Sequence, residues 1–67
     1  MTTEPTEQQR HVARQVRDAC VRAALEAYEQ AGMSGLCHEG AWECAVGAMR
    51  SLDLDAVLAA SDDPGGE

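Results

Sequence analysis

Small residues recur at helical spacing through residues 34–54, which read SGLCHEGAWECAVGAMRSLDL. Three of them are glycines, although a glycine inside a helix costs roughly 0.5–1 kcal/mol relative to alanine. Gly40 and Gly47 are seven residues apart and therefore lie on one side of a helix. We interpret this pattern as a helix that approaches another backbone closely. It indicates no reaction.

The chain is too short to form a large hydrophobic core. A domain of 67 residues buries only about 60% of its unfolded surface, so a single copy would be marginally stable. Twelve alanines favour helices but contribute little buried area each. We therefore expect that a partner contributes to stability.

A first helix is predicted over residues 6–31, after a flexible tail at residues 1–5. Thr6 and Gln9 have the spacing of a capping box, and Gly32 suits the left-handed position that ends a helix.

This helix carries two apolar stripes, and a helix in a simple hairpin needs only one. The first stripe contains Val12, Val16, Ala19, Ala23 and Ala27. The second contains Val21, Leu25 and Tyr28. The second stripe indicates self-association, although a short third helix that folds back could cover it instead.

The second helix has two possible starts. A cap at Ser34 gives a helix over residues 35–52, and the alternative is a start nearer Gly40. We favour Ser34, because one continuous core stripe then results. It consists of Cys37, Ala41, Cys44 and Ala48, flanked by Ala45 and Leu52 and widened by Trp42, Val46 and Met49. Trp42, the largest side chain, is predicted to anchor the packing of this helix against its neighbour.

After Arg50, Asp53 is predicted to cap a short third helix over residues 54–60, although the second helix could simply continue. Residues 61–67 read as a disordered acidic tail. The fold class predicted for the single domain at 6–60 is all-α: an antiparallel helical hairpin with a short third helical segment. We expect two copies to pair into a homodimeric helical bundle.

The net charge of −7 is unevenly distributed. Residues 8–25 hold four arginines against one acidic residue, whereas residues 26–67 hold nine acidic residues against Arg50 alone. So acidic a chain repels phosphate backbones, which argues against nucleic-acid binding. The arginine-bearing helix could instead meet an acidic surface, including the acidic half of another copy.

No apolar run approaches the ~20 residues that cross a bilayer, and residues 1–10 lack the features of a signal peptide. We therefore expect a cytoplasmic protein without a membrane partner. Three cysteines in a reducing compartment argue against a disulfide framework, and their default role is that of small buried apolar residues.

Metal and cofactor sites are not predicted. Cys37 and Cys44 are two helical turns apart, roughly 10 Å along the axis, and no second ligand pair exists. The candidate binding residues are Cys37, His38, Glu39, Trp42 and Glu43. If Ser34 caps the helix, Cys37 lies in its first turn, where the helix dipole favours a thiolate. Glu39 and Glu43 could pair for acid–base work, but they read more simply as a solvated face.

These residues predict a small acidic interaction or accessory protein that acts by protein–protein association and without catalysis. The alternative is a thiol-based sensor of a small ligand, a metal or redox state that uses Cys37 with His38.

Residues 23–54 resemble a group of short bacterial helical proteins that share a GLCxEGxWExA-type motif. The positions that match the pattern are Tyr28, Glu29, Gly35, Leu36, Cys37, Glu39, Gly40, Trp42, Glu43, Arg50 and Leu52–Leu54. The group has no established activity, so the resemblance implies no mechanism. It marks where a shared role would lie.

Overall fold

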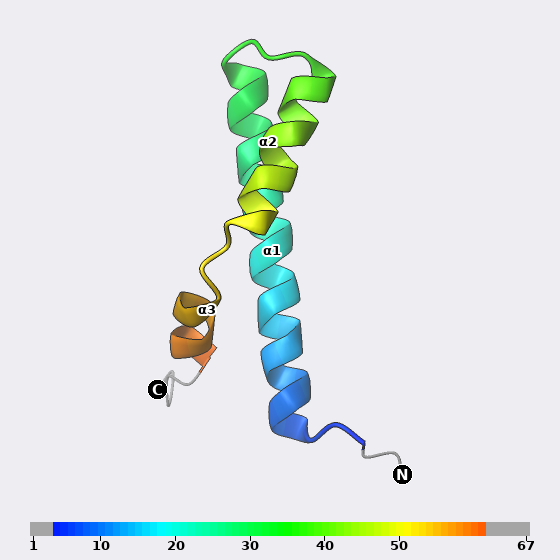
Figure 1. Cartoon of the computed structure of the whole chain (residues 1–67), viewed down its shortest axis with the longest axis vertical. Coiled ribbons are helices and arrows are strands. Elements are labelled where there is room, and N and C mark those ends of the chain that lie inside the picture. Colours follow the sequence, from blue (N-terminus) through cyan, green and yellow to red (C-terminus); the bar gives the residue numbers. More distant parts are fainter. Residues whose placement is uncertain (1–3, 62–67) are drawn as a thin grey trace.

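The computed structural model describes residues 4–61, which form three α-helices and no strand: α1 (Glu7–Met33), α2 (His38–Arg50) and α3 (Leu54–Ser61). Both α2 and α3 pack against α1, with α2 alongside its C-terminal half (Figure 1). The all-α prediction is confirmed. Of the predicted tails, residues 1–3 and 62–67 lie outside the described residues, and Ser61 belongs to α3. None of the helices described is both long and apolar enough to span a membrane.

The N-terminus of α1 has the predicted capping box. The Gln9 amide donates to Thr6 Oγ1 at 3.0 Å, and the Thr6 amide donates to Gln9 Oε1 at 2.9 Å. Two backbone donors that α1 cannot satisfy internally thus find side-chain partners.

The C-terminus of α1 lies beyond the predicted end at Ala31. The helix continues through Gly32 to Met33, and Gly35, with φ +90°, takes the left-handed position instead. The Leu36 amide then donates to the Ala31 carbonyl at 3.0 Å, and the Gly35 amide to the Gly32 carbonyl at 3.1 Å. This is a Schellman motif, which satisfies carbonyls at the helix end.

Because residues 34–36 form this turn, α2 cannot begin at residue 35 as predicted. Cys37 has an extended backbone (φ −71°, ψ 171°) and is the N-cap residue, and α2 begins at His38. Cys37 therefore precedes the helix instead of lying in its first turn. At the other end, α2 stops at Arg50, two residues before the predicted end, with Ser51 as the C-cap.

The predicted break between the second and third helices is confirmed. Asp53 Oδ1 accepts a hydrogen bond from the Ala56 amide at 3.1 Å, so Asp53 caps α3 as expected.

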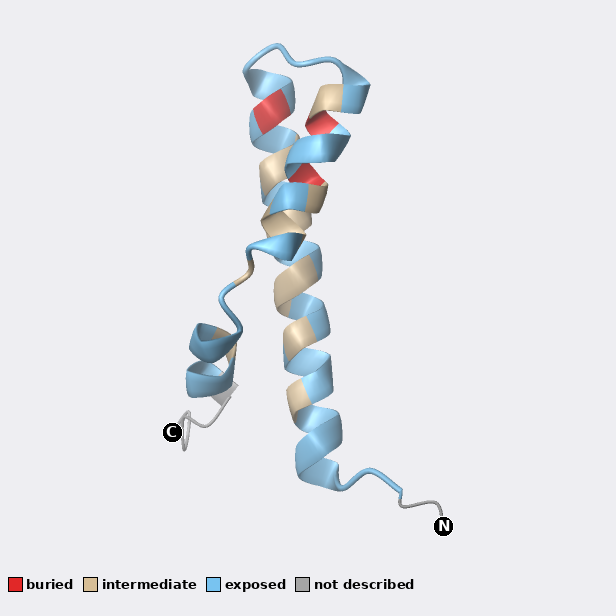
Figure 2. Ribbon diagram, viewed as in Figure 1, coloured by how far each residue is buried: buried red, intermediate tan, exposed pale blue. Residues whose placement is uncertain are grey.

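The buried core of the described residues consists of three alanines where α1 faces α2: Ala31, Ala41 and Ala45, each at most 6% exposed (Figure 2). The first predicted stripe of α1 is half-buried throughout, whereas Val21 and Leu25 of the second stripe are exposed. Of the two apolar stripes predicted on α1, the first thus packs within the chain and the second does not.

The prediction for Trp42 is wrong within a single chain, because its side chain is 56% exposed. Ala41 and Ala45 face α1, and a rotation of about 100° per residue turns Trp42 to the edge of the contact. Cys37 and Cys44, both predicted in the core stripe, are exposed. Cys37 lies outside the helix as its N-cap residue, and Cys44 lies on a side of α2 that does not face α1.

The predicted close approach at the glycines is also absent from the described residues. A Cβ on Gly47 would meet open space, and a Cβ on Gly40 would touch the Leu36 side chain at 3.6 Å and not a backbone.

The fold is elongated, with principal extents of 47 × 35 × 14 Å. The Cα radius of gyration is 15.3 Å, against roughly 11 Å for a compact domain of this length.

Candidate interaction surface

A shallow apolar groove of about 430 Å³ runs between α1 and α2. It is lined by Ala24, Leu25, Tyr28, His38, Trp42 and Ala45. Ala45 is buried and Ala24 half-buried, whereas Leu25, His38 and Trp42 are exposed, so the alanines are the more deeply placed residues of its lining. The groove opens widely to solvent, so it resembles a contact surface more than an enclosed ligand site.

Tyr28 and His38 connect the two helices at one rim of this groove. Tyr28 Oη and His38 Nδ1 are hydrogen-bonded at 2.5 Å, and the rings meet edge-to-face with centroids 5.7 Å apart. His38 can lie there because it is the first residue of α2, immediately after the turn. The pair fixes the level at which α2 begins along α1.

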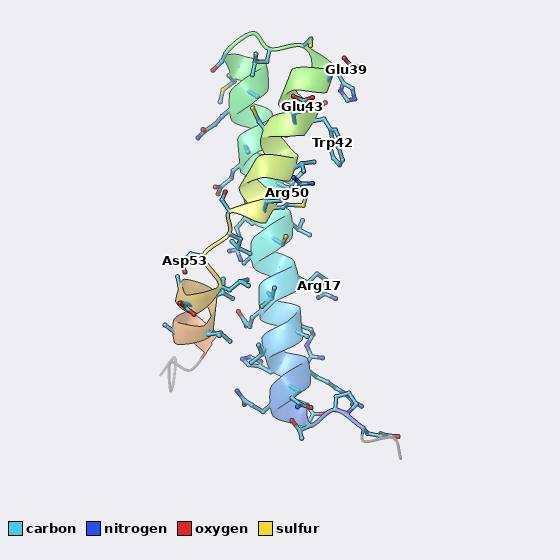
Figure 3. The ribbon with its side chains drawn as sticks, in the orientation of Figure 1. Arg17, Glu39, Trp42, Glu43, Arg50 and Asp53 are labelled. Atoms are coloured by element: carbon cyan, nitrogen blue, oxygen red, sulfur yellow. The ribbon has the colours of Figure 1, made fainter. Side chains whose placement is uncertain are left out.

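Trp42 stands between this groove and a neighbouring hollow on α2. The hollow is lined by Trp42, Glu43, Val46, Gly47 and Arg50. With Val21 52% exposed and Leu25 59% exposed, Trp42 completes an apolar patch on one side of the molecule. Figure 3 shows Trp42 projecting outward from α2. We call Val21, Leu25 and Trp42 the apolar face.

The five predicted binding residues do not converge on one site. His38 and Trp42 line the groove, and Glu43 lies beside Trp42 in the neighbouring hollow. Cys37 and Glu39 are exposed and line neither. Cys37 makes no side-chain capping hydrogen bond, and the adjacent imidazole is bonded to Tyr28.

Among the described residues, no group of three His, Cys, Asp or Glu side chains is placed to hold a metal ion. Cys37 and Cys44 are exposed and Cys20 is half-buried, and all three are free thiols. Two of the three thus differ from the expectation of buried apolar cysteines.

Charged side chains are largely unpaired within residues 4–61. The ion pairs there are Arg10 with Glu7 at 4.0 Å and Arg17 with Asp18 at 3.1 Å, both exposed. Exposed pairs of this kind contribute little to stability. The charges of this surface are therefore available to another molecule.

Another groove, between α1 and α3, has a volume of about 310 Å³. Its lining residues are Gln15, Ala19, Arg22, Leu52, Asp53, Ala56, Val57 and Ala60. It holds none of the predicted binding residues.

The contact between Tyr28 and His38 was not predicted from the sequence. The positions of the helix ends could have predicted it. The first helix ends at Met33 and the second begins at His38, so Tyr28 lies five residues before that end and His38 directly after the turn. That inference requires the correct helix ends, and the sequence prediction ends the first helix at Gly32 and not at Gly35.

No protein-family model, curated protein or solved structure matches this chain in the comparisons made with each.

Proposed function

We propose that this chain is a small, non-catalytic interaction or accessory protein that acts by protein–protein association. In this proposal α1 and α2 form an antiparallel helical hairpin, and two copies pair into a homodimeric helical bundle. The observation that carries the proposal is the exposure of Val21, Leu25 and Trp42 on a fold whose buried core, among the described residues, is three alanines.

The energetics favour association over a free monomer. Burial of apolar surface contributes roughly 25 cal/mol per Å², and alanines bury little. Aromatic side chains such as Trp42 are among those that most often dominate binding surfaces. A second copy over the apolar face would bury apolar surface that one chain leaves exposed.

The non-catalytic part of the proposal is supported by the geometry of the candidate carboxylates. Glu39 and Glu43 are exposed on α2, and the two hollows beside Trp42 are open to solvent. A catalytic site needs a nucleophile or base, an orienting group and water exclusion in one place. These residues supply no such combination.

Sedimentation equilibrium at micromolar concentration tests the proposal. We expect a dimer whose melting temperature rises with protein concentration, because the partner copy binds the folded chain and not the unfolded one. A monomer with a sharp, concentration-independent melt would contradict it.

A matched pair of variants locates the surface. Leu25 and Leu54 are similarly exposed, at 59% and 52%, but Leu25 lies on the apolar face and Leu54 begins α3. Leu25→Asn should therefore weaken the dimer, and Leu54→Asn should leave it unchanged. Equal effects would place the contact elsewhere.

A thiol-based sensor that uses Cys37 is the second candidate, favoured by the exposure of Cys37 at the N-terminus of α2. Titration of the native protein with a thiol reagent tests it. A sensor requires that Cys37 react faster than the same thiol in the unfolded chain. A rate equal to the unfolded rate contradicts the sensor, and protection by added zinc would show metal binding.

A further inference from the structure

Charge is unevenly distributed along α1 and α2. Residues 8–17 of α1 contain Arg10, Arg14 and Arg17 and no acidic residue, and Glu7 and Asp18 on either side pair with Arg10 and Arg17. Residues 23–49 contain four glutamates and neither Lys nor Arg, and Arg50 follows them. Because α2 lies alongside the C-terminal half of α1, all four glutamates fall at the end that carries the turn (Figure 1).

The apolar face lies on the same side of α1 as the basic residues. Steps of three or four residues place side chains on one side of a helix. Such steps link Arg10, Arg14, Arg17, Val21, Leu25 and Tyr28. Figure 3 shows Arg17 and Trp42 projecting toward the same side of the molecule. One continuous surface therefore runs from arginines, through apolar side chains, to the glutamates of α2.

The spacing along this surface is symmetric about Val21. Arg14 and Tyr28 each lie seven residues from Val21, or about 10 Å at 1.5 Å per residue. The hydrogen bond to His38 sets the start of α2, and hence Glu39, at the level of Tyr28. Glu43, one turn further along α2, lies nearer the level of Leu25.

We propose that two copies associate in opposite directions about a two-fold axis near Val21, with Arg14 and Arg17 of each against the partner's Glu39 and Glu43. This rests on the self-association proposed above and specifies its geometry. Within residues 4–61 neither Glu39 nor Glu43 has an ion-pair partner, so both carboxylates are available to it.

The apolar centre of this arrangement follows from the two-fold axis. Val21 meets the partner's Val21, and Trp42 lies close to the partner's Arg17, where a guanidinium can stack on the indole ring. The opposite, parallel arrangement places arginines against arginines and glutamates against glutamates, which like-charge repulsion disfavours.

Charge reversal with rescue tests the arrangement by sedimentation equilibrium. The variant Arg14→Glu with Arg17→Glu makes both ends acidic, and we expect its dimer dissociation constant to rise about tenfold or more. Adding Glu39→Arg and Glu43→Arg restores opposite charges across the contact and the original net charge. We expect this fourfold variant to return close to the original dissociation constant.

A matched control separates local contacts from net charge. Arg22→Glu changes the net charge as much as Arg14→Glu does, but Arg22 lines the groove between α1 and α3. Arg14→Glu should weaken the dimer more than Arg22→Glu, with helix content by circular dichroism unchanged in both.

The outcomes distinguish the two proposals. If the unmodified chain is a monomer, self-association itself is wrong. If it is a dimer but the double reversal has no effect, or the fourfold variant shows no rescue, only the opposed arrangement is overturned.

Discussion

Tyr28 and His38 join α1 to α2 through a hydrogen bond between Oη and Nδ1 at the rim of an apolar groove. Tyr28 is half-buried and His38 is exposed, so water competes for this hydrogen bond. The bond therefore orients the helices more than it stabilises them. A neutral hydrogen bond has a net worth of about 0.5–1.5 kcal/mol, and less where water competes.

The first prediction concerns this bond. Tyr28→Phe removes the hydroxyl and keeps the ring, so we expect a loss of at most about 1 kcal/mol in the free energy of unfolding, measured in urea. Tyr28→Ala also removes the ring contact with His38 and should cost more. Equal losses for both variants would show that the hydroxyl carries the whole contact.

Trp42→Ala should leave the helices of one chain formed and weaken association. The side chain is 56% exposed, so its removal opens no cavity between α1 and α2. An aromatic anchor at an interface typically contributes about 2 kcal/mol or more to binding. Sedimentation should show a weaker dimer at unchanged helix content, measured well above the dissociation constant. Helix loss at that concentration would mean that Trp42 packs within the chain.

Ala45→Leu should separate α1 from α2. Ala45 is 2% exposed where α2 faces α1, so a larger side chain would push the two helices apart, and overpacking costs about 1–3 kcal/mol. Ala13→Leu is the control, because Ala13 is an exposed residue of α1. We expect urea unfolding to show destabilisation in the first variant and little change in the second.

Two glycine variants should have opposite effects. Gly35 has φ +90°, where a Cβ is strained, so Gly35→Ala should destabilise the chain by about 1 kcal/mol. Gly47 lies inside α2 beside open space, so Gly47→Ala should stabilise it by roughly 0.5–1 kcal/mol. Thermal melts of the dimer would also show whether a partner's backbone contacts Gly47. In that case the added methyl group would clash, and Gly47→Ala would destabilise the dimer.

Cys37→Ser should stabilise α2. Cys37 is an N-cap residue without a side-chain hydrogen bond, and serine is among the best N-cap residues, at roughly 0.5–2 kcal/mol over alanine. Cys37→Ala is the control and should be close to neutral. The helix content of both variants by circular dichroism checks the expectation, and no gain from serine would contradict the N-cap assignment.

Local capping chemistry was predictable from the sequence. The Thr6–Gln9 box and the Asp53 cap each depend on residues three apart, and both were found. The turn was not predictable to the residue, because glycines at positions 32 and 35 can both take a left-handed conformation and the prediction used Gly32. The left-handed Gly35 moved the start of α2 to His38 and took Cys37 out of the helix.

The packing face of α2 was predicted in part. Ala41 and Ala45 of the predicted face are buried, whereas Cys44 and Trp42 are exposed. Small residues occur all around this helix, so a helical wheel does not show where the buried face ends. The exposed second stripe of α1 was recognised from the sequence, but the groove that it forms with His38 and Trp42 needed the observed turn.

The Schellman turn between Ala31 and Leu36 also sets an order of events during folding. Contacts between α1 and α2 close loops as short as the ten residues from Tyr28 to His38, whereas α3 returns to α1 from much farther along the chain. Short loops lose less entropy on closure and form sooner, typically within microseconds. We therefore expect the paired helices to be assembled before they encounter another chain, so that the encounter is a docking of preformed surfaces.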